Sequence, residues 1–488
     1  MSQSKKILEI AGESWMSGIA LQPYIGVGGL FSEATNFDPF ERLGVYKTSL
    51  VERQWGASTV TVAGLFNVGA TIGGLPYFYS FGSGATYRIK TADTVTNVLD
   101  VTSYITGITT IRGAGIYKDR IIYANDSTVK ARPQDVTSGS EVTLLSTLST
   151  ANHIMKVGAD GNLYITNKQY IAMVSNIAAT TDNYAQQVVF DDDVVTRDLE
   201  SDGKYLVIAA DNNSVLPTGS TGTHKCFVAF WNMKSGEYSQ KWEFADFQIY
   251  AIKKIEDDIL IFGRNGIYIC NVNSPPQLLM SLRGNANITA SLTTYGNPGA
   301  VVSVNNNVVM WGAGGTVYAY GRPHPSLKRI FYKPYSLASG SNIYSLFHDG
   351  NLVYAMDTIP KLWDFGGGST RQTSTLTLSD VDFKTKYKLA FVKVVLRSAL
   401  ASGQSVDVEI KTEADNRTVL DTSGTQWGYA SDKANASHIF YPNAISGSTN
   451  VAGLFEDLTN IEITNNKAEI RRVEIWANPV DPAQNSGY

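Results

Sequence analysis

Residues 257–272 read DDILIFGRNGIYICNV, and this stretch decides the fold. An acidic turn precedes a run of apolar residues, a second short turn follows, and another apolar run completes the phrase. Both runs have the length of a β-strand, and Asp, Asn and Gly favour the tight turns between strands. The phrase therefore predicts two consecutive strands of an antiparallel sheet.

The same pattern recurs along the chain. Related phrases are anchored at Leu75, Asp119, Asp160, Asp202, Asp258, Asn306 and Asp349, so that successive anchors lie 41 to 56 residues apart. Four-stranded propeller blades repeat every ~40–50 residues. The longest spacing contains residues 211–225, which we interpret as an insertion at a loop tip. The chain is therefore predicted to be all-β, with a β-propeller of about seven blades and six as the alternative count.

A physical reason supports the repeat. A small twisted sheet cannot bury both faces alone, but a ring of such sheets can, and few open edges remain. The first apolar run of each copy is nearly continuous, which is typical of a strand buried on both faces. The second run carries an aromatic residue such as Tyr170 or Trp231. The copies share no polar residue that a repeated binding site requires, so the repeat is interpreted as a scaffold.

The two ends of the chain do not repeat. Longer strands of alternating polarity after Gly368 predict a C-terminal antiparallel β-sandwich. The expected domains are an extended N-terminal arm at 1–55, the propeller at 56–370, the sandwich at 371–480 and a flexible tail at 481–488.

The arm contains a candidate docking element. Phe37, Asp38, Pro39 and Phe40 form a compact cluster in which the two aromatic rings could contact a neighbouring subunit. The alternative is that the arm packs on its own propeller, and the sequence leaves both readings open.

Composition and charge limit the classes of function. Charged residues make up 17% of the chain, below the usual ~25%, and the net charge is −4 with a pI near 5.8. This balance predicts no broad attraction to nucleic acid, and no charged stripe for a DNA channel is recognisable. The start of the chain does not resemble a secretory signal, and no apolar run is long enough for a membrane helix.

No catalytic or metal-binding constellation is recognisable. Cys226 and Cys270 are interpreted as buried small hydrophobic residues, with a single disulfide as the alternative. The run Asp191–Asp193 lacks the alternating ligands of a calcium loop, and the five histidines are scattered. The sequence therefore predicts no enzyme, metal or cofactor, although carboxylates from two blades of a propeller hydrolase would escape notice.

Two non-repeating phrases carry a family resemblance. Residues 26–47, GVGGLFSEATNFDPFERLGVYK, and residues 471–479, RRVEIWANP, flank a degenerate propeller. This layout resembles the tail nozzle, or packaged-DNA stabilisation, proteins of short-tailed bacteriophages. The resemblance implies a non-enzymatic virion protein, assembled in the host cytoplasm, that forms a ring of typically six subunits. Such a ring continues the DNA channel, retains the genome, contacts packaged DNA non-specifically and docks portal, adaptor or other tail proteins.

A glycan-binding protein is the alternative. A lectin propeller or tail fibre-like protein that contacts the host surface would use exposed aromatic rings to stack on sugars. Trp427 and Tyr429 in the C-terminal region are the candidates for stacking, and packing inside the protein is the competing reading for both.

Overall fold

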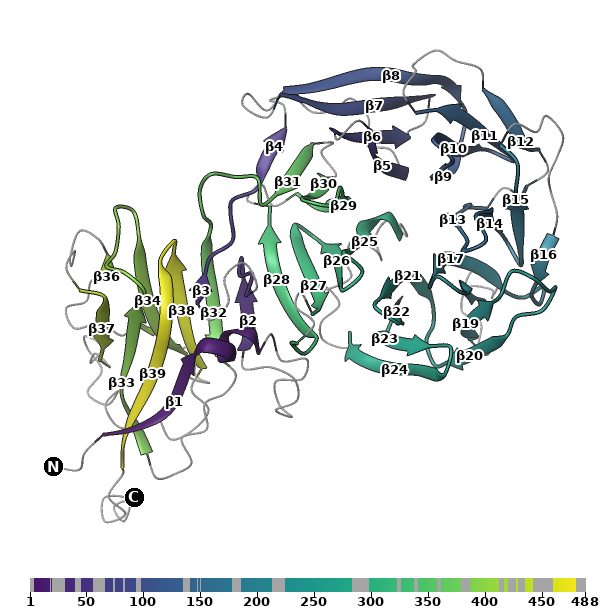
Figure 1. Cartoon of the computed structure of the whole chain (residues 1–488). Coiled ribbons are helices and arrows are strands. Elements are labelled where there is room, and N and C mark those ends of the chain that lie inside the picture. Colours follow the sequence, from purple (N-terminus) through teal and green to yellow (C-terminus); the bar gives the residue numbers. More distant parts are fainter. Residues whose placement is uncertain are drawn as a thin grey trace. The chain divides into compact units, whose positions relative to one another are not determined.

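Figure 1 shows the chain as a computed structural model, in which the described secondary structure is almost entirely β. The structure describes residues 4–17, 19, 31–39, 45–55, 66–72, 75–81, 84–93, 98–134, 141–146, 148–149, 151–177, 186–212, 224–282, 298–322, 326–337, 341–357, 361–378, 387–411, 417–419, 427–428, 435–441 and 460–479. Two compact units divide the chain: Met1–Val51, Tyr318–Ser336 and Gly366–Tyr488 form one, and Glu52–Val317 with Leu337–Phe365 form the other.

The repeats form a β-propeller. Within the described residues there are seven four-stranded sheets, arranged around a ring with the first strand of each nearest the middle (Figure 1). In ring order the strands are β5 (Phe66–Ile72), β6 (Leu75–Phe81), β7 (Gly84–Asp93), β8 (Val98–Ile108); β9 (Ile111–Tyr117), β10 (Arg120–Asn125), β11 (Thr128–Pro133), β12 (Val142–Leu145); β13 (Met155–Val157), β14 (Leu163–Asn167), β15 (Tyr170–Val174), β16 (Gln186–Val189); β17 (Val195–Ser201), β18 (Leu206–Asp211), β19 (Cys226–Trp231), β20 (Gln240–Phe244); β21 (Ile249–Ile255), β22 (Asp258–Gly263), β23 (Gly266–Asn271), β24 (Ser274–Ser281); β25 (Val301–Val304), β26 (Val308–Ala313), β27 (Thr316–Gly321), β28 (Ile330–Ser336); and β29 (Ile343–His348), β30 (Val353–Asp357), β31 (Leu362–Phe365), β4 (Arg53–Trp55).

Every sequence anchor marks the hairpin between the first and second strands of a sheet. Between β9 and β10, Lys118 and Asp119 have φ of 47° and 59°, the pair of positive values that a type I′ turn requires. Asp202 and Asp349 instead accept a backbone N–H two residues further along, from Lys204 and Asn351 at 2.7 and 2.8 Å. Local turn chemistry therefore explains why the anchors are so often Asp or Asn.

The ring is completed by residues from the far end of the sequence. The outermost strand of the last sheet is β4, and it pairs antiparallel with β31 through Arg53↔Asp364 and Trp55↔Leu362. The expected arm at 1–55 therefore extends too far, because its last residues belong to the propeller. The sequence gives no hint of this pairing, since β4 has only three residues and carries no alternating pattern.

Apolar side chains hold neighbouring sheets together. Trp231 of β19 packs edge-on against Tyr164 of β14 in the preceding sheet, with ring centroids 5.3 Å apart. Cys226 and Cys270 lie in one hydrophobic cluster between the sheet β17–β20 and the sheet β21–β24, and both are buried free thiols. The expectation of two small buried hydrophobic residues is therefore confirmed. Burial raises the pKa of the Cys270 thiol to about 12, so it stays protonated.

The other unit contains two sheets, and strands from both ends of the chain enter each of them. One sheet is composed of β1 (Lys5–Ala11), β39 (Glu469–Pro479), β33 (Tyr387–Leu396) and β37 (Ser437–Phe440), with β3 (Tyr46–Lys47) also on β39. The other is composed of β2 (Phe31–Thr35), β32 (Thr373–Leu378), β38 (Asn460–Asn466), β34 (Ser405–Lys411) and β35 (Arg417–Val419), with β36 (Trp427–Gly428) also on β34. A short 3-10 helix, η1 (Gly12–Met16), follows β1, and η4 (Pro298–Ala300) precedes β25.

A single hydrophobic core joins these two sheets. It includes Ile10, Val392 and Val473 from the first sheet and Val408 and Ile463 from the second. The described parts of residues 1–51 therefore do not form a separate extended arm. They pair with strands that lie more than 300 residues further along the chain, as Ile10↔Val473 and Ala34↔Leu376 show.

Candidate functional site

The candidate docking cluster is largely inside the protein. Phe37 is 1% exposed and packs edge-on against Tyr46, with ring centroids 4.9 Å apart. Pro39 is also buried, Asp38 is half-buried, and Phe40 lies outside the described residues. Phe37 and Pro39 therefore anchor the N-terminal segment in its own core, rather than presenting it to a neighbouring subunit. The alternative reading, packing within the chain, is correct for them. The ring of Phe37 lies in the C-terminal core, and its backbone N–H donates to the carbonyl oxygen of Lys333 on β28 at 3.2 Å.

The candidate sugar-stacking residue is also buried. Trp427 is 1% exposed and stacks on His438, with ring centroids 5.0 Å apart and an angle of 18° between the planes. Its indole has no open face for a glycan, so the prediction for Trp427 is wrong and the packing interpretation is correct. Tyr429 lies outside the described residues.

The acidic run and the histidines gather no metal site where the structure describes them. Asp193 pairs with Lys225 at 2.6 Å at the surface, and Asp191 and Asp192 are exposed. His153 is buried, and its two ring nitrogens lie 2.7 and 2.9 Å from backbone carbonyl oxygens of Thr166 and Ser149. No group of three or more potential metal ligands occurs among the described residues.

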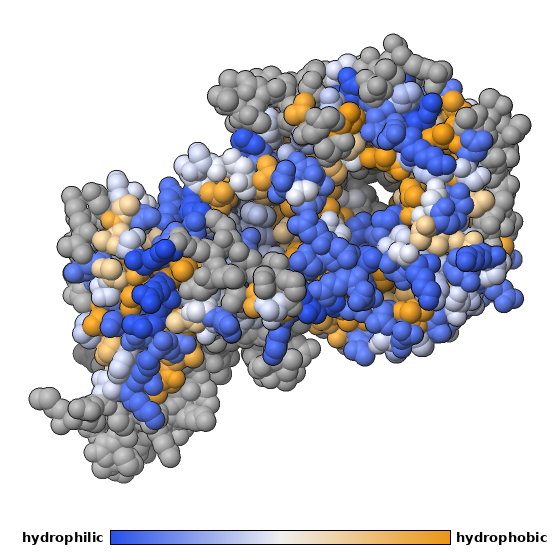
Figure 2. Space-filling model, in the orientation of Figure 1, coloured by the Kyte–Doolittle hydropathy of each residue, from blue (hydrophilic) through white to orange (hydrophobic). Residues whose placement is uncertain are grey.

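Charged residues meet on the inner strands of the propeller. Glu200 of β17 is nearly buried and pairs with Lys156 of β13 and with Lys253 of β21, the latter at 3.7 Å. The three residues come from three successive sheets, on strands β13, β17 and β21 that lie toward the middle of the ring (Figure 1). The space-filling view shows an opening in the middle of the ring (Figure 2). The sequence did not reveal this cluster because its members lie about fifty residues apart. Burial alone would raise the pKa of Glu200, but the two lysines lower it.

Asp198 lies beside this cluster and has the opposite tendency. It is buried, and its carboxylate accepts the backbone N–H groups of Leu199 and Ile252, each at 2.8 Å. Burial raises its pKa from the ordinary 3.8 to about 6, against the effect of Lys253 and these hydrogen bonds, and Glu200 adds to the rise. The folded protein therefore holds this proton over a pH range in which the unfolded chain releases it.

A pH dependence of stability follows from Asp198. Because its pKa is higher in the folded state, its contribution to the free energy of unfolding falls as pH rises from about 4 to about 6, by about 3 kcal/mol. Asp198→Asn removes the ionisation and keeps an acceptor for one N–H group. We expect wild type to lose stability relative to Asp198→Asn as pH rises across this range, because only wild type must release the proton. Urea denaturation of both proteins at pH 4.5, 5.5 and 7 measures the difference in their unfolding free energies.

The matched control is Asp192→Asn, since Asp192 is an exposed carboxylate in the same part of the chain. A difference between Asp198→Asn and wild type that stays constant with pH, or that matches the control, would mean that Asp198 is already ionised when the folded protein is at pH 5.

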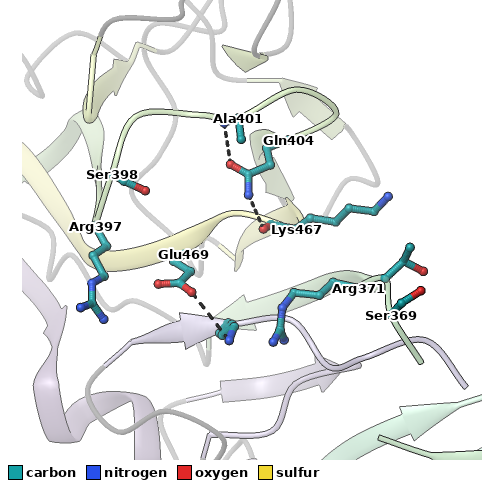
Figure 3. A pocket seen from close by; sticks show the side chains of 10 residues that line it. Ser369, Arg371, Arg397, Ser398, Ala401, Gln404, Lys467 and Glu469 are labelled. Atoms are coloured by element: carbon teal, nitrogen blue, oxygen red, sulfur yellow. Dashed lines mark hydrogen bonds and ion pairs between the residues drawn. The ribbon is translucent and has the colours of Figure 1, made fainter. Parts of the chain in front are cut away.

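A basic pocket lies in the unit that contains the C-terminal sheets. Its volume is about 660 Å³, and its ionisable lining residues are Lys47, Arg371, Arg397, Lys467 and Glu469 (Figure 3). Lys47 pairs with Glu469 at 3.7 Å. The four cations outnumber the one carboxylate, so the pocket carries an excess of positive charge.

Two linked turns form one wall of the pocket. Gln404 accepts the backbone N–H of Ala401 and donates to the carbonyl oxygen of Lys467, both at 2.8 Å (Figure 3). The side chain of Asn465, which is fully buried, bonds both the N–H and the carbonyl oxygen of Ala468, at 2.9 and 3.0 Å. These bonds fix the backbone on both sides of Lys467.

The opposite wall is held by the segment that precedes β32. Arg371 donates to the carbonyl oxygen of Thr48, and the N–H of Val51 donates to Thr370 at 2.7 Å. The chain passes so close here that a side chain on Gly368 would lie 2.0 Å from the carbonyl oxygen of Val51. Glycine is therefore required at this position for the wall to form.

Comparison with known proteins finds similarity among solved structures alone. No family model and no curated protein matches the sequence. Among solved structures, the WD40 β-propeller domain of Doa1 is similar at 11% identity, with a TM-score of 0.44 over 65% of this chain and 97% of that one. A catalytically inactive virginiamycin B lyase from Staphylococcus aureus with quinupristin is similar at 10% identity, with a TM-score of 0.45 over 65% of this chain and 98% of that one.

At this level of identity the likeness concerns the fold alone. It carries nothing about activity or ligands. Separately, no helix among the described residues is both long and apolar enough to cross a membrane. The arrangement of the described sheets shows a chain that contains a β-propeller.

Proposed function

We propose that the chain is a non-enzymatic structural protein of a bacteriophage tail, and more narrowly a ring-forming nozzle. Such a protein continues the DNA channel, retains the packaged genome and docks portal, adaptor or other tail proteins. The finer description of the fold belongs to the same proposal: each four-stranded sheet is one of seven blades, and the two C-terminal sheets are a β-sandwich. The sequence resemblance of residues 26–47 and 471–479 is the source of the proposal.

One structural observation supports it most directly. The described part of residues 1–55 contributes a strand or strand pair to three different sheets, through β1 and β3 on β39, β2 on β32, and β4 on β31. Both ends of the described chain are thereby hydrogen-bonded into sheets along their length. Ends secured in this way suit a part that bears load during DNA packaging and ejection.

Self-association has candidate contacts on the rim of the propeller. Val189 on β16 and Leu278 on β24 are 51% and 53% exposed, and both lie on the outermost strand of a sheet. Exposed apolar residues on strands at the edge of a sheet favour contact with another subunit. They replace Phe37 as the residues through which we expect the chain to meet its neighbours.

Mass photometry of the purified chain tests the ring. We expect a species of about six subunits that dissociates when Val189 and Leu278 are both replaced by Lys, because a charge on each would have to be desolvated at the contact. Replacing the exposed Lys5 and Asp257 by Gln and Asn serves as the control. A wild-type chain that stays monomeric at all accessible concentrations would argue against the ring.

A further inference from the structure

We propose that the basic pocket lined by Lys47, Arg371, Arg397, Lys467 and Glu469 is a binding site for a compact phosphate group. The relevant observations are the excess of positive charge, the shape of the cavity and the way its walls are fixed. This inference goes beyond the proposed function and does not depend on it, because a phosphate site is compatible with any position of the protein in or outside a virion.

The composition of the pocket favours an oxyanion. Two of its cations are arginines, Arg371 and Arg397, whose planar guanidinium groups match the geometry of phosphate oxygens. The rest of its surface includes the hydroxyl groups of Ser369, Thr370 and Ser398, which donate readily to phosphate. A neutral or cationic ligand would meet repulsion or unmatched donors in the same place.

Two of the cations remain accessible for a ligand. Glu469 lies next to Lys47 and compensates part of its charge. Within the described part of the chain, no carboxylate forms an ion pair with Arg397 or Lys467. Figure 3 shows Lys467 extending away from Glu469 at the right of the view, and Arg397 at the left. Glu469 is therefore placed to orient Lys47, and Arg397 and Lys467 are the cations that we expect to contact the ligand.

The backbone at Lys467 is held in a tight turn. Lys467 has φ of 65°, in the left-handed region that favours Gly or Asn, yet the residue here is a long cation. Asn465 and Gln404 fix the turn on both sides of it, so the conformation is enforced by the fold. The turn therefore holds Lys467 at the edge of the pocket without freedom of the backbone.

The shape of the pocket indicates a compact ligand. A volume of about 660 Å³ lies within the range of small-molecule sites, roughly 300–1,000 Å³. A duplex backbone would need cations spread along a line, whereas these line one pocket. The phosphate could belong to a small molecule such as pyrophosphate, or be the terminal phosphate of a nucleic acid strand, and the chemistry of recognition is the same.

Isothermal titration calorimetry on the full chain tests the site, with inorganic pyrophosphate as the first probe. We expect one saturable site per chain, weakened about tenfold by Arg397→Gln and by Lys467→Asn, since each removes one charge-assisted contact. Asn suits the positive φ at position 467, so that variant should fold at least as well as wild type. Circular dichroism confirms folding for both.

The control is Lys5→Gln, which removes an exposed cation of the same unit outside the pocket and should leave binding unchanged. A second arm compares a short oligonucleotide with and without a 5′-phosphate. Binding of pyrophosphate alone supports a small-molecule source, and binding of only the 5′-phosphorylated strand supports a strand end. Absence of binding by all probes would overturn the proposal. The proposal would also fail if the two oligonucleotides bound equally well and the pocket variants left that binding unchanged. It would fail, too, if Lys5→Gln weakened binding as much as the pocket variants do.

Discussion

Replacing Asp364 by Ala should lower the free energy of unfolding of the propeller by about 3–5 kcal/mol. Asp364 of β31 is fully buried, and its Oδ2 accepts Nε and Nη2 of Arg53 at 2.8 and 2.5 Å and the indole N–H of Trp55 at 2.7 Å. All three donors belong to β4, the short strand that completes the ring. Without the carboxylate, the guanidinium loses its buried counter-charge and the indole N–H loses its acceptor.

The loss should be specific to ring closure. Urea denaturation followed by circular dichroism gives the change in stability, and limited proteolysis should show earlier cleavage near β4 than in wild type. Asp257→Ala removes an exposed carboxylate of another sheet and should change stability by less than about 0.5 kcal/mol. If Asp364→Ala behaves like Asp257→Ala, then β4 is not held by this carboxylate.

Trp231→Ala should have an effect of similar size, about 3–5 kcal/mol, for a different reason. Trp231 is 1% exposed and fills the space between two neighbouring sheets, against Tyr164. Its indole N–H also donates to the carbonyl oxygen of Ser235 at 2.5 Å. Alanine removes the ring from a site whose backbone is fixed by pairing on both sides, so the cavity cannot collapse.

Trp231→Phe separates the two contributions. Phenylalanine keeps most of the contact with Tyr164 but loses the hydrogen bond to Ser235, so we expect a cost of about 1 kcal/mol from the bond and somewhat more from the smaller volume. Urea denaturation of both variants under the same conditions measures this order. If alanine is no more costly than phenylalanine, the packing between these two sheets does not depend on the indole ring.

The repeat could be read from the sequence because its signal is local. Each anchor, such as Asp202 or Asp349, sits in a hairpin of adjacent strands, and turn chemistry acts over only two or three residues. The apolar run that follows it, such as residues 206–211, is buried along its length. Both features depend on neighbours in the sequence, so the pattern survives even where the residues differ.

The strand pairing of the two chain ends could not be predicted from the sequence, because the paired segments lie far apart along the chain. Residues 53–55 complete a sheet with Leu362–Asp364, and Lys5–Ala11 pairs with the strand Glu469–Pro479. Nothing in segments as short as these specifies a pairing partner so far along the chain. For the same reason an aromatic cluster such as Phe37 and its neighbours resembles an exposed docking element, although its ring is in the core.

The basic pocket could not be predicted from the sequence for the same reason. Lys47, Arg371, Arg397 and Lys467 come from four separate segments, and none is part of a Lys- or Arg-rich run. Trp427 shows the same for exposure, since the sequence left stacking on a sugar and packing inside the protein both open, and the residue is enclosed. The clustering of charges and the exposure of a side chain depend on the folded structure, so the spacing of residues along the sequence predicts neither.

Analysis of tailed-phage particles produced by cells that carry the gene for this chain tests the proposed function most directly. Mass spectrometry of the particles should detect the chain, and electron microscopy should place it in a ring of about six copies at the tail. An antibody against the propeller should label the same position. Particles that lack the chain while the purified protein stays monomeric would contradict a role as a tail ring protein.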